Sequence, residues 1–216
     1  MSTAKRHGID DLSAFAMDFI HQAGEAAMRY YGKGKPQKKF DQGIVTQAEL
    51  KLSELFNDQL GKRFPEHHSF QIDHVKENYT HGGGRYLWIF DPLDGVANFQ
   101  AGIPVWGVSL ALLDNFWPIF GAFLMPATGD LFHARAGQEA FWGNRKIKIS
   151  ASEVIDDESL LLTYSRFHQQ YRTSFPGKIR NLGCASAHLC YVAMGRADAT
   201  LVANESYQGS AAARVI

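Results

Sequence analysis

The chain has 216 residues, of which 45% are hydrophobic and 20% are charged, and its formal net charge is zero. The 22 basic and 22 acidic residues leave no excess positive charge for nucleic acid or an anionic membrane surface. No apolar run approaches the roughly 18 residues that span a bilayer, and the N-terminal segment lacks the apolar core of a secretion signal. We therefore expect a cytoplasmic globular protein with no nucleic acid and no membrane as partner.

The first elements are expected to be a helix and a short hairpin. Apolar residues recur at helical spacing from Leu12 to Ala27, and Gly32 ends this run. Residues 37–46 contain Asp41-Gln42-Gly43, a sequence typical of a turn. These features predict a helix followed by a hairpin over residues 37–46.

A second helix is expected after Thr46. Thr46 and Glu49 have the spacing of a capping box, in which the two side chains cap the first turn of a helix. Glu49 could instead be the ligand of a second metal ion, but local physics favours the cap. Phe64-Pro65 ends the helix, whose inner face is expected to hold Ala48, Leu52, Leu55 and Phe56.

From residue 86 onward the sequence has the alternation and the short apolar runs of β-strands. The expected strands are Tyr86–Phe90, Val105–Leu113, Trp117–Met125, Leu131–Ala134 and Ser159–Thr163. Asp114-Asn115 is expected to form a hairpin turn, and residues 183–195, rich in small side chains, a helix. This order of elements predicts layered α+β or α/β packing.

The most informative segment is Asp91-Pro92-Leu93-Asp94-Gly95, which follows a hydrophobic strand. Two carboxylates this close at the edge of a core repel each other unless a cation lies between them. The bend around Pro92 can turn both toward one point, and the Leu93 carbonyl can add a neutral oxygen. The segment therefore predicts a site for Mg²⁺, which prefers oxygen ligands. The alternative is a polar turn in which an aspartate caps the next helix.

Two neighbouring features extend this prediction. Gly95 to Phe99 resembles the start of a helix, whose N–H groups favour a phosphate oxygen. Asp73 follows a strand-like run, and a third carboxylate would complete a typical site for a hard metal ion. The alternative for Asp73 is an exposed loop acid. Metal sites of this kind usually act on phosphate.

Together these segments resemble the inositol monophosphatase family of Mg²⁺-dependent phosphomonoesterases. Asp91 to Phe99 matches the central Asp-Pro-Ile-Asp-Gly-Thr-x-Asn-Phe motif of the family. Ile44-Val45-Thr46 with Glu49 is similar to its Val-Thr-x-x-Asp segment. Phe64 to Asp73 is similar to the stretch before its Gly-Glu-Glu, and Gly183 to Ala199 is similar to its late helix.

The resemblance implies an αβαβα sandwich, usually in a homodimer. Residues 1–216 would then form a single domain. In this domain residues 1–150 provide helices and an antiparallel sheet with the metal site, and residues 151–216 begin a second α/β part. Family members usually continue beyond the position that corresponds to Ile216, so the C-terminal part is expected to be truncated.

The resemblance also implies a hydrolase that uses Mg²⁺, with Mn²⁺ as a possible substitute. Such an enzyme removes phosphate from a small phosphorylated polyol or sugar, such as an inositol phosphate, through a metal-activated water. The catalytic residues would be Asp73, Asp91 and Asp94. The metal ligands would be Asp73, Asp91, the Leu93 carbonyl, Asp94 and Glu49. Phosphate and substrate would be bound by Gly95, Val96, Ala185 and Glu205.

The sequence departs from the family at several chemical positions. Val96 replaces a Thr whose hydroxyl helps to activate the water, and a hydrocarbon side chain cannot do this. Gly209 stands where ungapped alignment places an Asp that binds the second metal ion. The family's substrate-contacting Glu falls on Val202, and Glu205 is close enough to take its place.

These departures leave two alternatives to a competent monophosphatase. One is a catalytically impaired family member that binds metal, a phosphoryl ligand or a partner protein without efficient turnover. The other is a bisphosphate nucleotidase or a fructose bisphosphatase of the same superfamily. The second alternative ranks lower, because the segment between Asp73 and Asp91 lacks the long insertions that such relatives often carry.

Overall fold

The computed structural model describes residues 7–33, 42–70, 85–203 and 207–216. The helices are α1 (Ile9–Met28), α2 (Gln42–Arg63), α3 (Val96–Ala101), α4 (Phe167–Gln170), α5 (Ala185–Ala193) and α6 (Tyr207–Ser210). The strands are β1 (His68–Ser69), β2 (Tyr86–Asp94), β3 (Gly107–Asp114), β4 (Trp117–Met125), β5 (Asp130–Arg135), β6 (Ala140–Trp142), β7 (Arg145–Lys146), β8 (Leu160–Thr163), β9 (Lys178–Arg180) and β10 (Ala199–Leu201).

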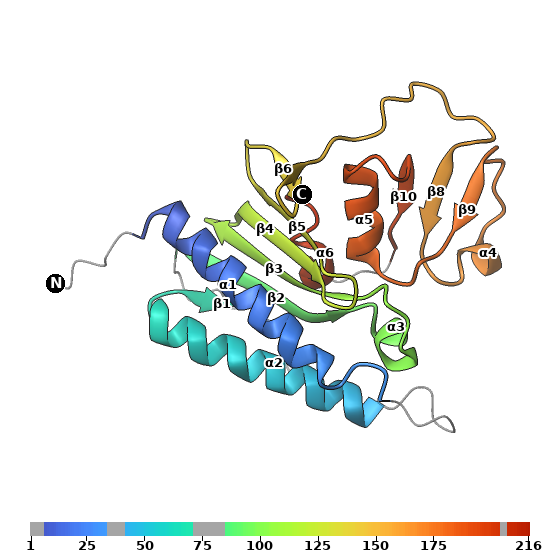
Figure 1. Cartoon of the computed structure of the whole chain (residues 1–216). Helices are drawn as coiled ribbons and strands as arrows, with labels where there is room; N and C mark the ends of the chain where they lie inside the picture. The colour runs from blue at the N-terminus through green and yellow to red at the C-terminus, as the bar shows by residue number, and fades with distance from the viewer. Residues whose placement is uncertain (1–6, 34–41, 71–84, 204–206) are drawn as a thin grey trace.

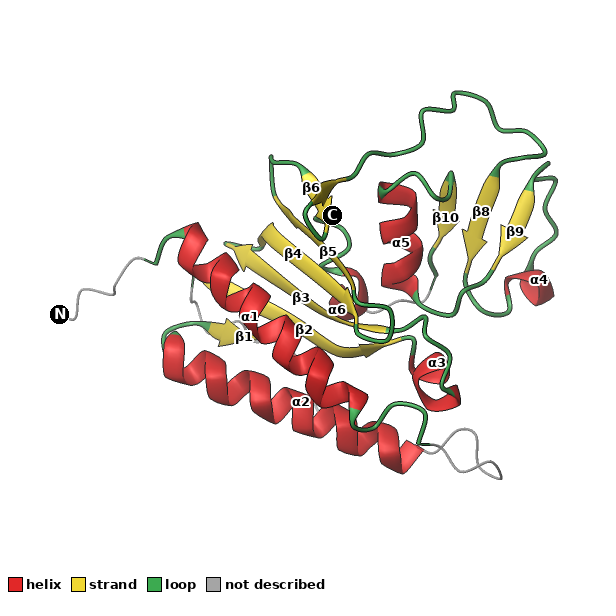
Figure 2. Ribbon diagram, viewed as in Figure 1, coloured by secondary structure: helices red, strands yellow, loops and turns green. Residues whose placement is uncertain are grey.

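Helices and sheets alternate as layers (Figures 1 and 2). The first sheet contains β1 to β7 in chain order, and the second, fully parallel sheet has the order β10-β8-β9. α1 and α2 cover one face of the first sheet, while α5 and α6 lie between its other face and the second sheet. The mixed α+β layered fold predicted from the sequence is confirmed.

The alternation of side chains along β2 explains how the first sheet holds two cores. Trp88 and Phe90 point toward α1 and α2, where they join one large aromatic cluster. Leu87 and Ile89 point to the opposite face, where Ala211 and other residues of the C-terminal segment pack on them. A strand buried on both faces reads as a continuous hydrophobic run, as the sequence here does.

No helix of the described residues combines the length and the apolar composition that crossing a bilayer needs.

The second helix differs from the sequence prediction. α2 begins at Gln42, so Thr46 and Glu49 lie inside the helix and the predicted capping box is wrong. The predicted hairpin is wrong for residues 42–46 and otherwise lies outside the described residues. Packing of Leu52, Phe56 and Leu60 against the core stabilises the whole helix. The predicted turn glycine, Gly43, lies in this helix. The packing outweighs the roughly 1 kcal/mol by which glycine is less favourable than alanine inside a helix.

The turn between β3 and β4 lies one residue later than predicted. Asp114 is the last residue of β3, and the turn residues Asn115 and Phe116 both have positive φ, at 48° and 68°. Two positive φ values are typical of the primed turns that suit the twist of a hairpin. Arg85 pairs with Asp114 and thereby holds the end of β3 beside the start of β2.

Asn98 fastens the α3 region to the loop before α5. Its Nδ2 donates hydrogen bonds to the carbonyls of Val105, at 2.6 Å, and Leu182, at 2.7 Å. Gly183 lies directly against it, since a Cβ there would come within 2.8 Å of the Asn98 amide. A buried amide with two carbonyl partners fixes both segments, because each would lose a hydrogen bond if it moved.

We predict that Asn98→Ala lowers the free energy of unfolding by about 2–4 kcal/mol, because two part-buried carbonyls lose the Asn98 amide as donor. Urea denaturation followed by fluorescence measures this change. Asn144→Ala is the matched control, since Asn144 is exposed in the turn between β6 and β7, and it should change stability by less than about 0.5 kcal/mol. Equal effects of the two substitutions would show that Asn98 does not fasten the layers.

Candidate functional site

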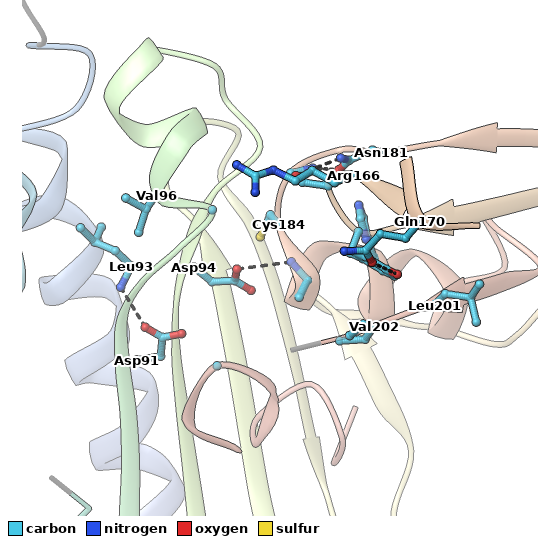
Figure 3. Close-up of a pocket in the computed structure, with 18 residues that line it drawn as sticks. Asp91, Leu93, Asp94, Val96, Arg166, Gln170, Asn181, Cys184, Leu201 and Val202 are labelled. Carbon is cyan, nitrogen blue, oxygen red and sulfur yellow. Dashed lines mark hydrogen bonds between the residues drawn. The ribbon is translucent and has the colours of Figure 1, made fainter. Parts of the chain in front are cut away.

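A cleft of about 660 Å³ lies where β2 and α3 face α5, α6 and the second sheet (Figure 3). Its volume is within the range of small-molecule sites in proteins. The first layer contributes Asp91, Leu93, Asp94, Gly95 and Val96. The remaining lining residues are Tyr164, Ser165, Arg166, Gln170, Asn181, Gly183, Cys184, Ala185, His188, Leu201, Val202, Ala203 and Gly209.

A bulge in β2 brings the two aspartates to the cleft. Asp91 pairs with Ser109 of β3 and Asp94 pairs with Gly107, so three steps along β2 correspond to two along β3. In a regular strand, residues three apart point to opposite faces, whereas the extra residue of a bulge restores a common face. Pro92 lies within this bulge, where a residue without an N–H does not interrupt the ladder. The bend expected around Pro92 is therefore a bulge at the end of the strand.

The Asp94 carboxylate caps helix α5. Its Oδ1 accepts a hydrogen bond from the Ala185 N–H at 3.3 Å, and its Oδ2 accepts one from the Ser186 N–H at 2.6 Å. Asp94 is buried, and Figure 3 shows its carboxylate directed at the start of α5. The first N–H groups of a helix have no partner within the helix, so an anionic acceptor there is stabilising. Asp94 therefore joins the first sheet to the helical layer behind it.

Asp91 and Leu93 form the neighbouring part of the cleft wall. The Asp91 Oδ1 accepts a hydrogen bond from the Leu93 N–H at 3.2 Å, which holds the carboxylate beside the bulge. Asp91 is half-buried and Leu93 is buried. A half-buried carboxylate in a cleft is placed to bind a cation without full loss of its hydration.

Gly95 allows the chain to turn from the bulge into α3. It has a φ of +85° and is the N-cap of α3. A Cβ at this position would lie 3.0 Å from the Val105 carbonyl oxygen and 3.1 Å from the Cys184 Cβ. Both the positive φ and this close approach require glycine. The start of α3 is thereby held at the edge of the cleft, beside Asp94.

The opposite wall comes from the carboxyl ends of the parallel strands. Tyr164, Ser165 and Arg166 follow β8, Asn181 follows β9, and Val202 follows β10. Ligands in parallel α/β sheets bind outside the carboxyl ends of the strands, so the cleft has the position expected for such a sheet. The sequence prediction missed most of this wall, and the residues directly after each apolar strand were the signal that could have found it.

Among the described residues of this wall, Arg166 carries the cationic side chain. It has a φ of +70°, which is uncommon for a residue other than glycine. No ion pair of its guanidinium is found within the described part of the chain, and Figure 3 shows the group reaching over the cleft toward the side of Val96 and Cys184. An exposed guanidinium at a cleft is a natural partner for an anionic group of a ligand.

Two buried side chains of the α5 region have pKa values that keep them uncharged. Burial raises the pKa of the Cys184 thiol well above its ordinary value, and the Asp94 carboxylate adds to the shift. Burial lowers the pKa of His188, partly opposed by Asp94. The His188 Nε2 accepts a hydrogen bond from the Leu182 N–H at 3.0 Å, so this nitrogen has no free lone pair for proton transfer. Both residues are therefore structural parts of the cleft wall.

The structure brings most, but not all, of the predicted site residues together. Asp91, Leu93, Asp94, Gly95, Val96 and Ala185 all line the cleft, as does Gly209. Glu49 lies on α2 and is not among the described lining residues. Asp73 and Glu205 lie outside the described residues. Within the described ranges no cluster of three or more acidic, histidine or cysteine side chains is placed to hold a metal ion.

Comparison with known proteins finds phosphatases that align with most of this chain. A histidinol-phosphatase from Chlorobaculum parvum is 28% identical to it over 193 residues, which are 85% of this chain and 73% of that protein. A fructose-1,6-bisphosphatase/inositol-1-monophosphatase from Thermotoga maritima is 26% identical over 190 residues, 85% of this chain and 72% of that protein.

The structure is similar to a solved inositol monophosphatase from Thermotoga maritima, with a TM-score of 0.80 and 26% identity, over 95% of this chain and 81% of the other. The sequence profile described as the inositol monophosphatase family matches residues 9–216. That range includes the bulged strand, the start of α3 and the helix capped by Asp94. The chain belongs to the inositol monophosphatase family.

Proposed function

We propose that this protein is a metal-dependent phosphomonoesterase that hydrolyses the monophosphate of a small polyol or sugar. The observation that carries the proposal is the bulge in β2, which places Asp91, Leu93 and Asp94 on one wall of a cleft of ligand size. The relatives support the same class, since those compared above are named as phosphatases of small phosphorylated metabolites.

The oxygen atoms at the bulge are of the kind that a divalent cation prefers as ligands. Asp91 and the Leu93 carbonyl supply hard oxygen atoms, and we propose Asp73, outside the described residues, as the third protein ligand. Mg²⁺, or Mn²⁺ in its place, would neutralise phosphate charge there and lower the pKa of a water molecule. Glu49 remains a proposed ligand only from the family resemblance.

The other residues of this wall would bind and orient the phosphate group. We propose that the backbone N–H groups of Gly95 and Val96 donate to its oxygen atoms, since both residues line the cleft. The Val96 side chain offers no hydroxyl to accept or relay a proton, so the carboxylates alone would orient the attacking water. We therefore expect slower turnover than a family member with Thr at this position would have.

The substrate contact predicted for Ala185 is not directly available to a ligand. Its N–H already donates to Asp94 in this structure, so a substrate hydroxyl would have to compete with a carboxylate for it. Glu205 is kept as a proposed substrate contact from sequence alone, because it lies outside the described residues. The proposed single domain and homodimer likewise rest on the family resemblance.

Arg166 favours a second candidate substrate, a sugar bisphosphate. Its guanidinium reaches over the cleft from the wall opposite Asp91. A second phosphate on the leaving group would neutralise this charge, whereas a cationic leaving group such as histidinol would be repelled by it. Among the activities named in the relatives, Arg166 thus favours sugar bisphosphate over histidinol phosphate hydrolysis for this chain.

We predict that Asp91→Asn lowers kcat/KM for the best phosphate ester by at least about 100-fold. Mutation of a residue that only hydrogen-bonds to a metal ligand typically lowers activity by about 10- to 100-fold, and loss of a direct ligand should lower it at least as much. Phosphate release at saturating Mg²⁺ measures this loss. Asp157→Asn is the matched control, since Asp157 is exposed and does not line the cleft. Unchanged turnover in Asp91→Asn would overturn the proposed site. Metal binding without turnover in the unaltered protein would favour the impaired alternative.

We predict that Arg166→Gln lowers kcat/KM for a sugar bisphosphate by about 10- to 100-fold, the value of one hydrogen bond to a charged group. The monophosphate of the same sugar should lose less than about twofold, because it lacks the second anion. Arg172→Gln, at an exposed arginine outside the lining, is the control. Equal losses for both substrates would contradict a role in binding a second phosphate.

A further inference from the structure

We infer that this cleft is built for a single divalent cation, because a hydrogen-bonded junction occupies the place of a second one. The junction consists of Asp94 on β2, Ser186 on α5 and Gly209 on α6, and it joins these three elements (Figure 1). The inference rests on the proposed function, since it concerns the number of cations at that same site.

Asp94 is the first part of the junction. Both of its carboxylate oxygens accept backbone N–H groups of α5, so the side chain is held toward the helix. If the carboxylate rotated to bind a metal ion, the buried N–H groups of Ala185 and Ser186 would lose their acceptor. Loss of such a cap destabilises the start of a helix. The positive end of the α5 dipole also lies here and disfavours another cation.

Ser186 and Gly209 are the second part. The Ser186 hydroxyl donates a hydrogen bond to the Gly209 carbonyl at 2.9 Å, and the Ser186 side chain is fully buried. Gly209 stands where the family resemblance places a metal-binding Asp, and it brings no carboxylate to the cleft. In this chain a hydrogen bond from Ser186 therefore holds α6 against α5. The family resemblance would instead place a carboxylate and a metal ion at this position.

Packing holds the segment after Gly209 against the first sheet. Ala211 and Ala212 are buried against Leu87 and Ile89. A Cβ at Gly121 would lie 2.3 Å from the Ala212 carbonyl oxygen, so this backbone rests directly on β4. The position of α6 thus depends on apolar contacts and the Ser186 hydrogen bond. A second cation is not needed to close the bottom of the cleft.

The number of bound Mn²⁺ ions per chain tests the inference directly. Electron paramagnetic resonance of free Mn²⁺ counts them in the full chain, with and without inorganic phosphate. One ion per chain, lost in Asp91→Asn, is the expected result. Two ions per chain would overturn the inference and leave the proposed function intact, whereas no bound ion would overturn the proposed function.

Ser186→Ala tests the junction by a second route. We expect the Tm to fall by about 3–8 °C, because the buried hydrogen bond from the Ser186 hydroxyl to the Gly209 carbonyl is lost. The fall should be the same with and without Mn²⁺. Ser109→Ala is the matched control, since the buried Ser109 hydroxyl has no hydrogen-bond partner among the described residues, and its Tm should change little. A fall in Ser186→Ala that Mn²⁺ restores, or no fall at all, would contradict a junction that works without a metal ion.

Discussion

The bulge at the end of β2 is the constraint on which the cleft depends. Without the extra residue, Asp91 and Asp94 would point to opposite faces of the sheet, and one of them would enter the core beneath α1 and α2. With it, both carboxylates lie on the side where α5, α6 and the second sheet approach. The same residues thus end a buried strand and begin a polar cleft, which explains why two acids are tolerated next to so large an apolar core.

The two acids have different surroundings, and this difference shapes the proposed chemistry. Asp94 is buried and satisfied by the first N–H groups of α5, so its charge stabilises the contact between two layers. Asp91 is half-buried and lines the cleft together with Leu93, where a cation can reach it. Across the cleft, Arg166 faces them from the carboxyl end of β8. This arrangement suits an anionic substrate between a cation on one wall and a guanidinium on the other.

Sequence reasoning found the layered fold and the wall built on the central motif, because both depend on local pattern. The strand prediction for residues 117–125 is confirmed in full, since its apolar run ends at clear turn residues. The start of α2 was predicted wrongly because tertiary packing outweighed a local cap signal. Arg166 and the Asp94–α5 contact could not be predicted, because each depends on segments brought together only by the packing of two sheets.

A crystal structure with Mn²⁺ and inorganic phosphate tests the central claim most directly, since anomalous scattering locates each manganese ion. The account predicts one anomalous peak in the cleft, beside Asp91 and the Leu93 carbonyl. Phosphate should lie near the start of α3, with Asp94 still bound to the Ala185 and Ser186 N–H groups. No anomalous peak in the cleft, or a peak between Asp94 and α6 with the α5 cap broken, would contradict it.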